Sequence, residues 1–372
     1  MNKMNDKMLT QPSGRAFNFC AGPAAIPLSV LEQARDELLN WQKSGASVME
    51  VSHRGKAFMQ LAEESMEDLR DLLAVPSNYT ILFLQGGARG QFAGVPLNIK
   101  GIATAADYVD SGFWAQSAIT EAQRYLTVNV VSDGKKNNFQ SLPKQSEWRL
   151  NTDAAYLHYT PNETIGGLEF PFIPDSGAVP LVADMSSSIL SKPLDVSLFG
   201  IIYAGAQKNI GMAGLTVVIV RNDLMEKKHS TCPSILSYKD QSGRDSMYNT
   251  PPTFAWYLSS LVFKWLKKSG GLQAIAEINE RKASKLYGII DETGFYSNNV
   301  DKNWRSRMNV PFSIINTTLN TLFLAKAEQE GFLYLKGHIA AGGMRASIYN
   351  AVPESHVDAL VDFMAEFERC HG

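Results

Sequence analysis

The stretch Ile201-Ile202-Tyr203-Ala204-Gly205-Ala206-Gln207-Lys208-Asn209-Ile210-Gly211 joins a short apolar run to a lysine that is flanked by small residues. Three further apolar runs also end at polar or glycine-rich segments: Tyr79–Leu84, Val179–Ala183 and Leu215–Val220. Such runs, separated by stretches compatible with helices, are typical of buried strands in a mostly parallel sheet that is covered on both faces. The sequence therefore predicts an α/β fold.

Helical patterns flank these strands. Ser29-Val30-Leu31-Glu32 fits a capping box, which predicts that a helix starts there. After about residue 254 the apolar spacing is that of long helices, and it becomes mixed again toward the end of the chain. We expect a polar leader over 1–15, a large α/β domain over 16–270 and a smaller α+β domain over 271–372. The first dozen or so residues of the large domain are expected to pack with the small one.

Composition excludes several classes of protein. The 372 residues suggest two domains, at about 150 residues per domain. With 35 Lys and Arg against 37 Asp and Glu, and no basic block, the chain lacks the charge of a nucleic-acid binder. No apolar run approaches the roughly 20 residues that span a bilayer. Three widely spaced cysteines form no disulfide framework, and the polar start lacks a signal peptide, so we expect a soluble cytoplasmic protein without membrane partners.

Common catalytic motifs are missing. No two glycines are separated by one residue, so the dinucleotide-binding pattern G-x-G-x-x-G is absent. The sequence has no Walker A motif, no H-E-x-x-H and no G-x-S-x-G. Its six histidines show no metal-ligand spacing, so we expect no metal site.

A glycine-rich segment, Gly86-Gly87-Ala88-Arg89-Gly90, follows the apolar run that ends at Leu84. A loop of this kind that opens a helix presents free N–H groups and the positive end of a dipole, which suits a phosphate. A tight strand-to-helix turn with no ligand would use the same residues.

Two further residues sit at strand ends. Asp184 follows an apolar strand at the place where open α/β sheets bind ligands, although an aspartate there also serves as a helix cap. Lys208, among small residues, would be partly desolvated and hence nucleophilic, whereas a lysine taken alone is more often exposed. Together, a phosphate cup, a buried acid and a nucleophilic lysine match the needs of pyridoxal phosphate: an anchor, a partner for the ring nitrogen and a Schiff base.

From Ala16 onward the chain resembles the phosphoserine aminotransferases, class V enzymes of fold type I that use pyridoxal phosphate. The resemblance is carried, in order, by these segments: Phe17-Asn18-Phe19, Gly22-Pro23, Glu50-Val51-Ser52-His53-Arg54-Gly55, Gly90-Gln91-Phe92, Asn162-Glu163-Thr164, Tyr203–Gly211, Asn249-Thr250-Pro251-Pro252-Thr253 and Gly342-Gly343-Met344-Arg345-Ala346-Ser347. It implies a large domain with a mostly parallel sheet plus a smaller α+β domain.

The resemblance also implies roles for individual residues. Lys208 corresponds to the Schiff-base lysine and proton shuttle, Asp184 to the partner of the pyridine nitrogen, and Trp114 to the aromatic ring that stacks on the cofactor. Trp114 taken alone would be read as a core residue. Further cofactor contacts correspond to Ala88, Arg89, Thr164 and Gln207. Asn249 and Thr250 correspond to a segment that reaches the cofactor phosphate of the other subunit, which implies a homodimer with shared sites and one cofactor per subunit.

The substrate residues implied by the resemblance are Arg54, Arg345, His53 and His338, the two histidines lying near the substrate phosphate. The sequence departs from the family at Ala88, where glycine is common, and at Ile339, where an arginine usually helps to hold that phosphate. The implied reaction moves the amino group of L-glutamate to 3-phosphohydroxypyruvate, and also to 3-hydroxy-2-oxo-4-phosphonooxybutanoate.

Two other functions remain open. One is that of another class V enzyme that uses pyridoxal phosphate, either a different aminotransferase or a cysteine desulfurase. A desulfurase would need a nucleophilic cysteine in the last third, where only Cys370 lies. A non-catalytic binding protein on the same fold would not need Lys208 and Asp184.

Overall fold

The structure, a computed structural model, describes residues 14–372; nearly all of the expected polar leader lies outside these residues. The strands are β1 (Phe17–Asn18), β2 (Tyr79–Leu84), β3 (Ala105–Asp110), β4 (Thr127–Asp133), β5 (Leu157–Tyr159), β6 (Leu181–Asp184), β7 (Ile201–Gly205), β8 (Thr216–Arg221), β9 (Tyr296–Ser297), β10 (Asn309–Ile314), β11 (Phe332–Leu333) and β12 (Met344–Ser347). The α-helices are α1 (Leu28–Glu37), α2 (Lys56–Leu73), α3 (Gly87–Ile99), α4 (Phe113–Ala122), α5 (Tyr238–Ser242), α6 (Thr253–Lys268), α7 (Gly271–Glu292), α8 (Asn320–Gln329) and α9 (Glu354–His371). Within the described part, no helix is both long and apolar enough for a membrane crossing.

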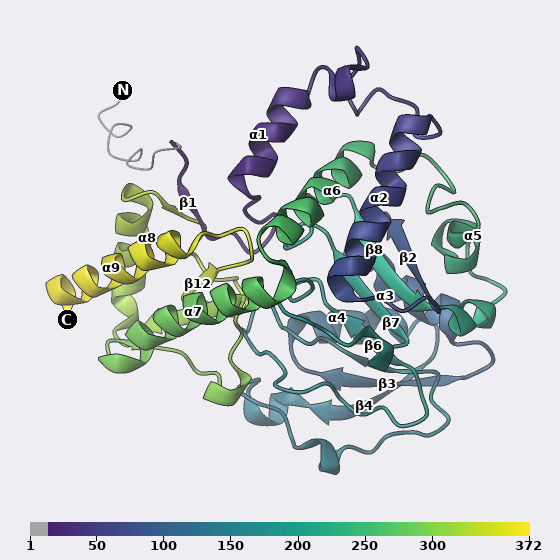
Figure 1. Cartoon of the computed structure of the whole chain (residues 1–372). Helices are drawn as coiled ribbons and strands as arrows, with labels where there is room; N and C mark the ends of the chain where they lie inside the picture. The colour runs from purple at the N-terminus through teal and green to yellow at the C-terminus, as the bar shows by residue number, and fades with distance from the viewer. Residues whose placement is uncertain (1–13) are drawn as a thin grey trace.

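The main sheet has seven strands in the order β2-β8-β7-β6-β5-β3-β4 (Figure 1). Strand β8 runs antiparallel to both of its neighbours, and every other pair is parallel. The prediction of a mostly parallel sheet is therefore confirmed. Because all strands but β8 point the same way, their carboxyl ends meet at one edge of the sheet, where open α/β sheets bind ligands.

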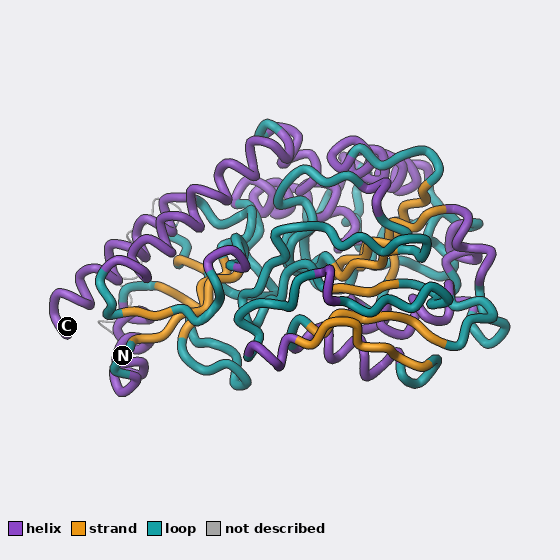
Figure 2. Tube along the Cα trace, turned by 90° about the horizontal axis from the view of Figure 1, so that it is seen from below, coloured by secondary structure: helices purple, strands orange, loops and turns teal. Residues whose placement is uncertain are grey.

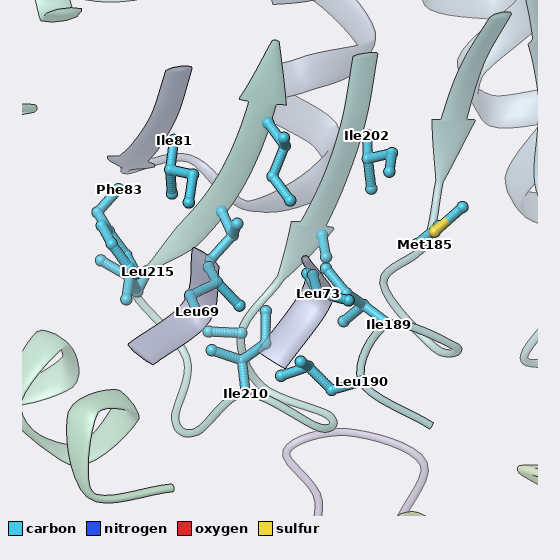
Figure 3. Close-up of a cluster of buried hydrophobic side chains, with 14 of the residues drawn as sticks. Leu69, Leu73, Ile81, Phe83, Met185, Ile189, Leu190, Ile202, Ile210 and Leu215 are labelled. Carbon is cyan, nitrogen blue, oxygen red and sulfur yellow. The ribbon is translucent and has the colours of Figure 1, made fainter. Parts of the chain in front are cut away.

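Helices cover both faces of this sheet. One hydrophobic cluster packs α2 and α6 against one face, and another packs α3 and α4 against the opposite face. Figure 3 shows part of the first cluster, where Leu69 and Leu73 of α2 lie beside Ile81, Phe83 and Ile202 of the sheet. Burial on both faces explains why the strands read as continuous apolar runs.

A second, smaller core lies beside the first. It gathers side chains from α7, α8, α9, β10 and β12 around a three-stranded antiparallel sheet, β12-β10-β9. Figure 2 shows the strands gathered in two regions, and the smaller region holds this sheet. Phe19 of the N-terminal segment is buried in the second core, and β1 pairs with β11. Helix α7 joins the cores, because Leu272 belongs to the first and Leu286 to the second.

The structure departs from the sequence expectations in two places. The predicted capping box is wrong, because α1 begins at Leu28 with Pro27 at its N-cap, and Ser29 lies inside the first turn. The strand patterns also missed β3 and β4. In β3, buried Asp107 interrupts the apolar run, and its carboxylate accepts hydrogen bonds from Asn129 Nδ2 and the Asn151 N–H. Strand β4 is an edge strand that is only partly buried, so it lacks an apolar run.

A lysine fixes the joint between α7 and the strand-to-helix connection after β12. Lys282 is 0 % exposed, and its ammonium donates to the carbonyls of Ile348, Tyr349 and Val352 at 2.9–3.1 Å. Burial lowers the pKa of this amine to about 7. Three donors meeting three carbonyls satisfy backbone groups that would otherwise be buried without partners.

Replacing Lys282 with methionine tests this joint. Lys282→Met keeps the length of the side chain and removes all three donors, so we expect the free energy of unfolding to fall by about 2–4 kcal/mol. The matched control is Lys285→Met on the same helix, where the exposed ammonium pairs with Glu354 and Asp358. Urea unfolding of both variants measures the difference, and equal midpoints would contradict the role given to Lys282.

Candidate functional site

A cavity of about 230 Å³ opens at the carboxyl edge of the main sheet. Its walls come from the segments that follow β2, β3, β5, β6 and β7, which is the arrangement expected of a ligand site in an open α/β sheet. The lining residues are Gly86, Gly87, Ala88, Arg89, Trp114, Thr160, Asn162, Thr164, Asp184, Ser186, Ser187, Gln207 and Lys208. Seven of the predicted site residues are among them: Ala88, Arg89, Trp114, Thr164, Asp184, Gln207 and Lys208.

The glycine-rich segment forms the start of α3, as expected. Gly86 is its N-cap with φ 97°, a conformation that favours glycine. Helix α3 begins at Gly87, so the N–H groups of its first turn face the cavity end at which Ala88 and Arg89 lie. No acidic side chain occupies that turn. This end of the cavity is therefore suited to an anion such as a phosphate.

Asp184 ends β6 and is buried. Its Oδ1 accepts both the N–H and the hydroxyl of Ser186, at 3.0 and 2.6 Å, and the Ser186 hydroxyl oxygen accepts the N–H of Gly205. Burial raises the pKa of the Asp184 carboxyl, while the bonds from Ser186 act in the opposite direction. All of the bonds from Ser186 go to Oδ1, which leaves Oδ2 available to a cation in the cavity.

Lys208 follows β7 and is 8 % exposed, so the alternative of an exposed lysine is wrong. Burial lowers the pKa of its amine to about 8, against the opposing effect of Asp184 and Glu163. Nζ donates to Thr164 Oγ1 at 2.5 Å and lies 5.6 Å from the centre of the Trp114 ring. The guanidinium carbon of Arg89 lies 5.5 Å from the centre of the same ring, so Trp114 is close to both cations.

Three polar atoms around the cavity are buried without a hydrogen-bond partner: Trp114 Nε1, Thr160 Oγ1 and Asn162 Oδ1. Buried polar groups are normally paired, so these atoms indicate a polar ligand. A cofactor with an anionic phosphate, a basic ring nitrogen and an aldehyde would find an anchor, an acid and an amine here. The residues present therefore fit pyridoxal phosphate.

The remaining predicted residues do not line this cavity. Arg345 comes nearest, because its Nη1 donates to the Thr164 carbonyl at 3.4 Å. The exposed His338 packs its ring 5.5 Å from that of Phe113, at the start of α4. Four others are absent from the cavity wall of the single chain, although Thr250 is hydrogen-bonded to Gln85 beside it: His53, Arg54, Asn249 and Thr250.

A larger cavity of about 350 Å³ lies against the loop that follows β6, which also lines the smaller cavity. Met185, Ser188 and Ile189 line it, whereas the intervening Ser186 and Ser187 line the smaller one. Its lining is mostly apolar, and it has neither the glycine-rich helix start nor Lys208. Within residues 14–372, no group of His, Cys, Asp and Glu side chains gathers as metal ligands would. The smaller cavity is therefore the candidate site.

The sequence reasoning missed two residues of the site. These are Ser186, two residues after Asp184, and Glu163, which the sequence analysis names only within the segment Asn162-Glu163-Thr164. Glu163 is 1 % exposed. It precedes Thr164 in the chain, and its carboxylate accepts a hydrogen bond from the N–H of Trp114. Its position beside Thr164 was visible in the sequence, but nothing local indicates that its carboxylate contacts a helix about fifty residues earlier.

The amine of Lys208 should titrate near its lowered pKa in the cofactor-free protein. Only the neutral amine attacks an aldehyde, so we expect reductive modification by benzaldehyde and cyanoborohydride to rise with pH around a midpoint of about 8 rather than 10.5. Peptide mass spectrometry measures the modification at each lysine. Lys282 is the control, because its amine is buried and fully bonded and should stay unmodified. A midpoint above pH 10 at Lys208 would refute the desolvated environment.

Comparisons with known proteins agree with the geometry. A family model for class V aminotransferases matches residues 16–360. The phosphoserine aminotransferase of Azotobacter vinelandii is 58% identical over 97% of this chain and 100% of its own length. Among solved structures, phosphoserine aminotransferase from Bacillus circulans subsp. alkalophilus superposes with a TM-score of 0.94 at 47% identity, covering 96% of this chain and 99% of that one. The phosphoserine aminotransferase with bound pyridoxal phosphate from Trichomonas vaginalis gives a TM-score of 0.91 at 45% identity, over 94% and 100%. The resemblance inferred from the motifs is thus confirmed, and the chain belongs to the class V aminotransferases, among the phosphoserine aminotransferases.

Proposed function

We propose that this chain uses pyridoxal phosphate to transfer the amino group of L-glutamate to 3-phosphohydroxypyruvate, which gives O-phospho-L-serine and 2-oxoglutarate. We further propose that it aminates 3-hydroxy-2-oxo-4-phosphonooxybutanoate. The observation that carries the proposal is the buried amine of Lys208 in one cavity with Asp184 and the glycine-rich start of α3. The named relatives support the choice of reaction.

The chain's own residues divide the work of holding the cofactor. When bound, pyridoxal phosphate supplies a ring that stabilises the negative charge left at the substrate Cα. Ala88, Arg89 and the N–H groups at the start of α3 hold its phosphate. The Asp184 carboxylate would hold the ring nitrogen and favour its protonated form, and Trp114 would hold the ring through its aromatic side chain. Thr164 and Gln207 complete the polar contacts.

Lys208 moves the proton. Its lowered pKa leaves a large neutral fraction near pH 8, so Nζ can accept the proton from the substrate Cα. The ammonium that results is favoured by the negative charges of Asp184 and Glu163. The Thr164 hydroxyl, 2.5 Å from Nζ, fixes the direction of the amine, and burial keeps bulk water from competing for the proton.

Two half-reactions test the activity. L-glutamate should change the visible absorbance of the cofactor-loaded protein, and 3-phosphohydroxypyruvate should restore it. An unchanged spectrum with glutamate would refute the proposal. Sulfide release from L-cysteine would favour a desulfurase instead. The structure gives little support to that alternative, because Cys370 is exposed on the last turn of α9, beside Glu366, and does not line the cavity.

We also propose that the active unit is a homodimer whose sites are shared. Asn249 and Thr250 are exposed, and so is Arg54, in keeping with surfaces that meet a partner. The Thr250 carbonyl accepts a hydrogen bond from Gln85 Nε2 at 3.1 Å. This segment therefore lies beside the turn that leads into Gly86 but outside the cavity of its own chain, where a second subunit would bring it to the neighbouring site.

Mixing two inactive variants tests the shared site. In a heterodimer of Lys208→Ala with Thr250→Glu, one site combines the intact lysine of one subunit with the intact threonine of the other. We expect each variant alone to be nearly inactive and the heterodimer to regain about half of the wild-type activity per dimer, by counting sites. Tagged subunits allow the heterodimer to be purified and assayed. An inactive, verified heterodimer would show that Thr250 does not act across the interface.

We propose that His53, Arg54, His338 and Arg345 bind the substrate. Ile339, which stands where an arginine is usual, is 97 % exposed, so the loop offers one cation fewer to a phosphate. We expect His338→Ala to lower kcat/KM for 3-phosphohydroxypyruvate on the order of ten- to a hundred-fold and to spare the glutamate half-reaction. Ile339→Arg should raise the same constant. Equal losses in both half-reactions of His338→Ala would mean that the histidine is structural.

We place the protein in the cytoplasm. All three cysteines are unpaired in the structure, which supports a reducing compartment.

A further inference from the structure

The carboxylate of Glu163 caps the start of helix α4 from a distant part of the chain. Its Oε2 accepts the N–H of Trp114 at 3.0 Å, and its Oε1 accepts the N–H of Ala115 at 2.9 Å. The Ser111 hydroxyl donates to Oε1 at 3.4 Å. These N–H groups belong to the first turn of the helix, where they have no partner within it. Two charge-assisted bonds therefore fix the backbone of Trp114 itself.

The residue at the N-cap of α4 makes room for this contact. Gly112 has no side chain to cap the helix, and a Cβ placed there would lie 2.8 Å from Cδ of Glu163. The usual capping role of a local Ser, Thr, Asp or Asn is thus transferred to a side chain from the segment after β5. Gly112 and Glu163 work as a pair, because a larger residue at 112 would push the carboxylate away.

The same segment also touches the nucleophile. Thr164, the next residue, accepts the hydrogen bond of Lys208 Nζ, while the Trp114 ring centre lies 5.6 Å from that nitrogen. The dipeptide 163–164 is therefore bonded on one side to the backbone of the ring that covers the cavity and on the other to the amine inside it. Neither bond depends on a bound group.

We propose that Glu163 is a positioning residue, which sets the Trp114 ring against Lys208 and thereby the orientation of the cofactor ring between them. The inference rests on the proposed function, because it takes Trp114 and Lys208 as the groups on either side of the cofactor. It predicts that a change at residue 163 alters the geometry of the bound cofactor before it alters the fold.

Replacing the carboxylate of Glu163 with an amide tests its hydrogen bonds without changing its shape. Both oxygens accept an N–H, so an amide in their place turns one acceptor into a donor that faces another donor. Burial raises the pKa of Glu163 to about 7, while the bonds from Ala115 and Trp114 act to lower it. Glu163→Gln keeps size and shape, so its effect reports the lost acceptor rather than a cavity.

The control is Glu169→Gln. Glu169 is another buried carboxylate of the same loop, but it pairs with Lys192 and Arg307 and lines the larger cavity. Each variant is purified with cofactor, and the readouts are the circular dichroism of the cofactor's visible band and the separate values of kcat and KM. Far-ultraviolet circular dichroism reports whether each variant is folded.

We expect Glu163→Gln to change the visible dichroism at least severalfold and to lower kcat on the order of ten- to a hundred-fold, with little change in the KM for glutamate. Glu169→Gln should retain the wild-type dichroism. Gly112→Ala, which displaces the carboxylate without removing it, should reproduce the optical change of Glu163→Gln.

A wild-type dichroism and kcat in Glu163→Gln would overturn the proposal. Unfolding of both Glu163→Gln and Gly112→Ala, with Glu169→Gln folded, would also overturn it, since Glu163 would then serve the fold alone. Failure of the proposed function looks different, because the wild-type protein itself would then not respond to glutamate.

Discussion

The arrangement of side chains around the cavity depends on the burial of one amine, that of Lys208. A lysine taken out of water strongly disfavours its charged form, so Lys208 can be kept there only by neighbours that suit both of its protonation states. Thr164 accepts a hydrogen bond from Nζ, and the carboxylates of Asp184 and Glu163 favour the ammonium. A mostly parallel sheet brings these groups together, because Glu163 and Thr164 follow β5, Asp184 ends β6 and Lys208 follows β7.

A chain of buried amides links the smaller core to this amine. The N–H of Asn350, just beyond β12, donates to Oδ1 of Asn209, the residue after Lys208. Asn279 of α7 donates to Oδ1 of Asn350, and Lys282 on the same helix bonds the adjacent carbonyls. Arg345 enters the region from β12 and reaches the carbonyl of Thr164. The second core therefore does more than pack against the first, since it holds the side chain of Asn209, the residue next to Lys208.

Sequence reasoning recovered what local pattern can encode. Apolar runs buried on both faces located β2, β6, β7 and β8, and the residues at their ends included Asp184 and Lys208. It missed strand β3, because Asp107 is buried there by partners from two distant segments. It missed Glu163 for the same reason: the contact with the start of α4 joins residues about fifty positions apart. The capping box failed because α1 begins at Leu28, with Pro27 at its N-cap, so Ser29 lies inside the first turn and cannot cap it.

We propose that Lys208, alone among the lysines of the chain, forms the covalent link to the cofactor. The most direct measurement is borohydride reduction of the purified cofactor-loaded protein, followed by peptide mass spectrometry to locate the covalently attached group. Because the amine of Lys208 is buried and partly neutral, we expect attachment at that residue only. Every other peptide should lack the absorbance of the attached group. Attachment at another lysine, such as Lys192 beside the larger cavity, or no attachment at all, would contradict the account.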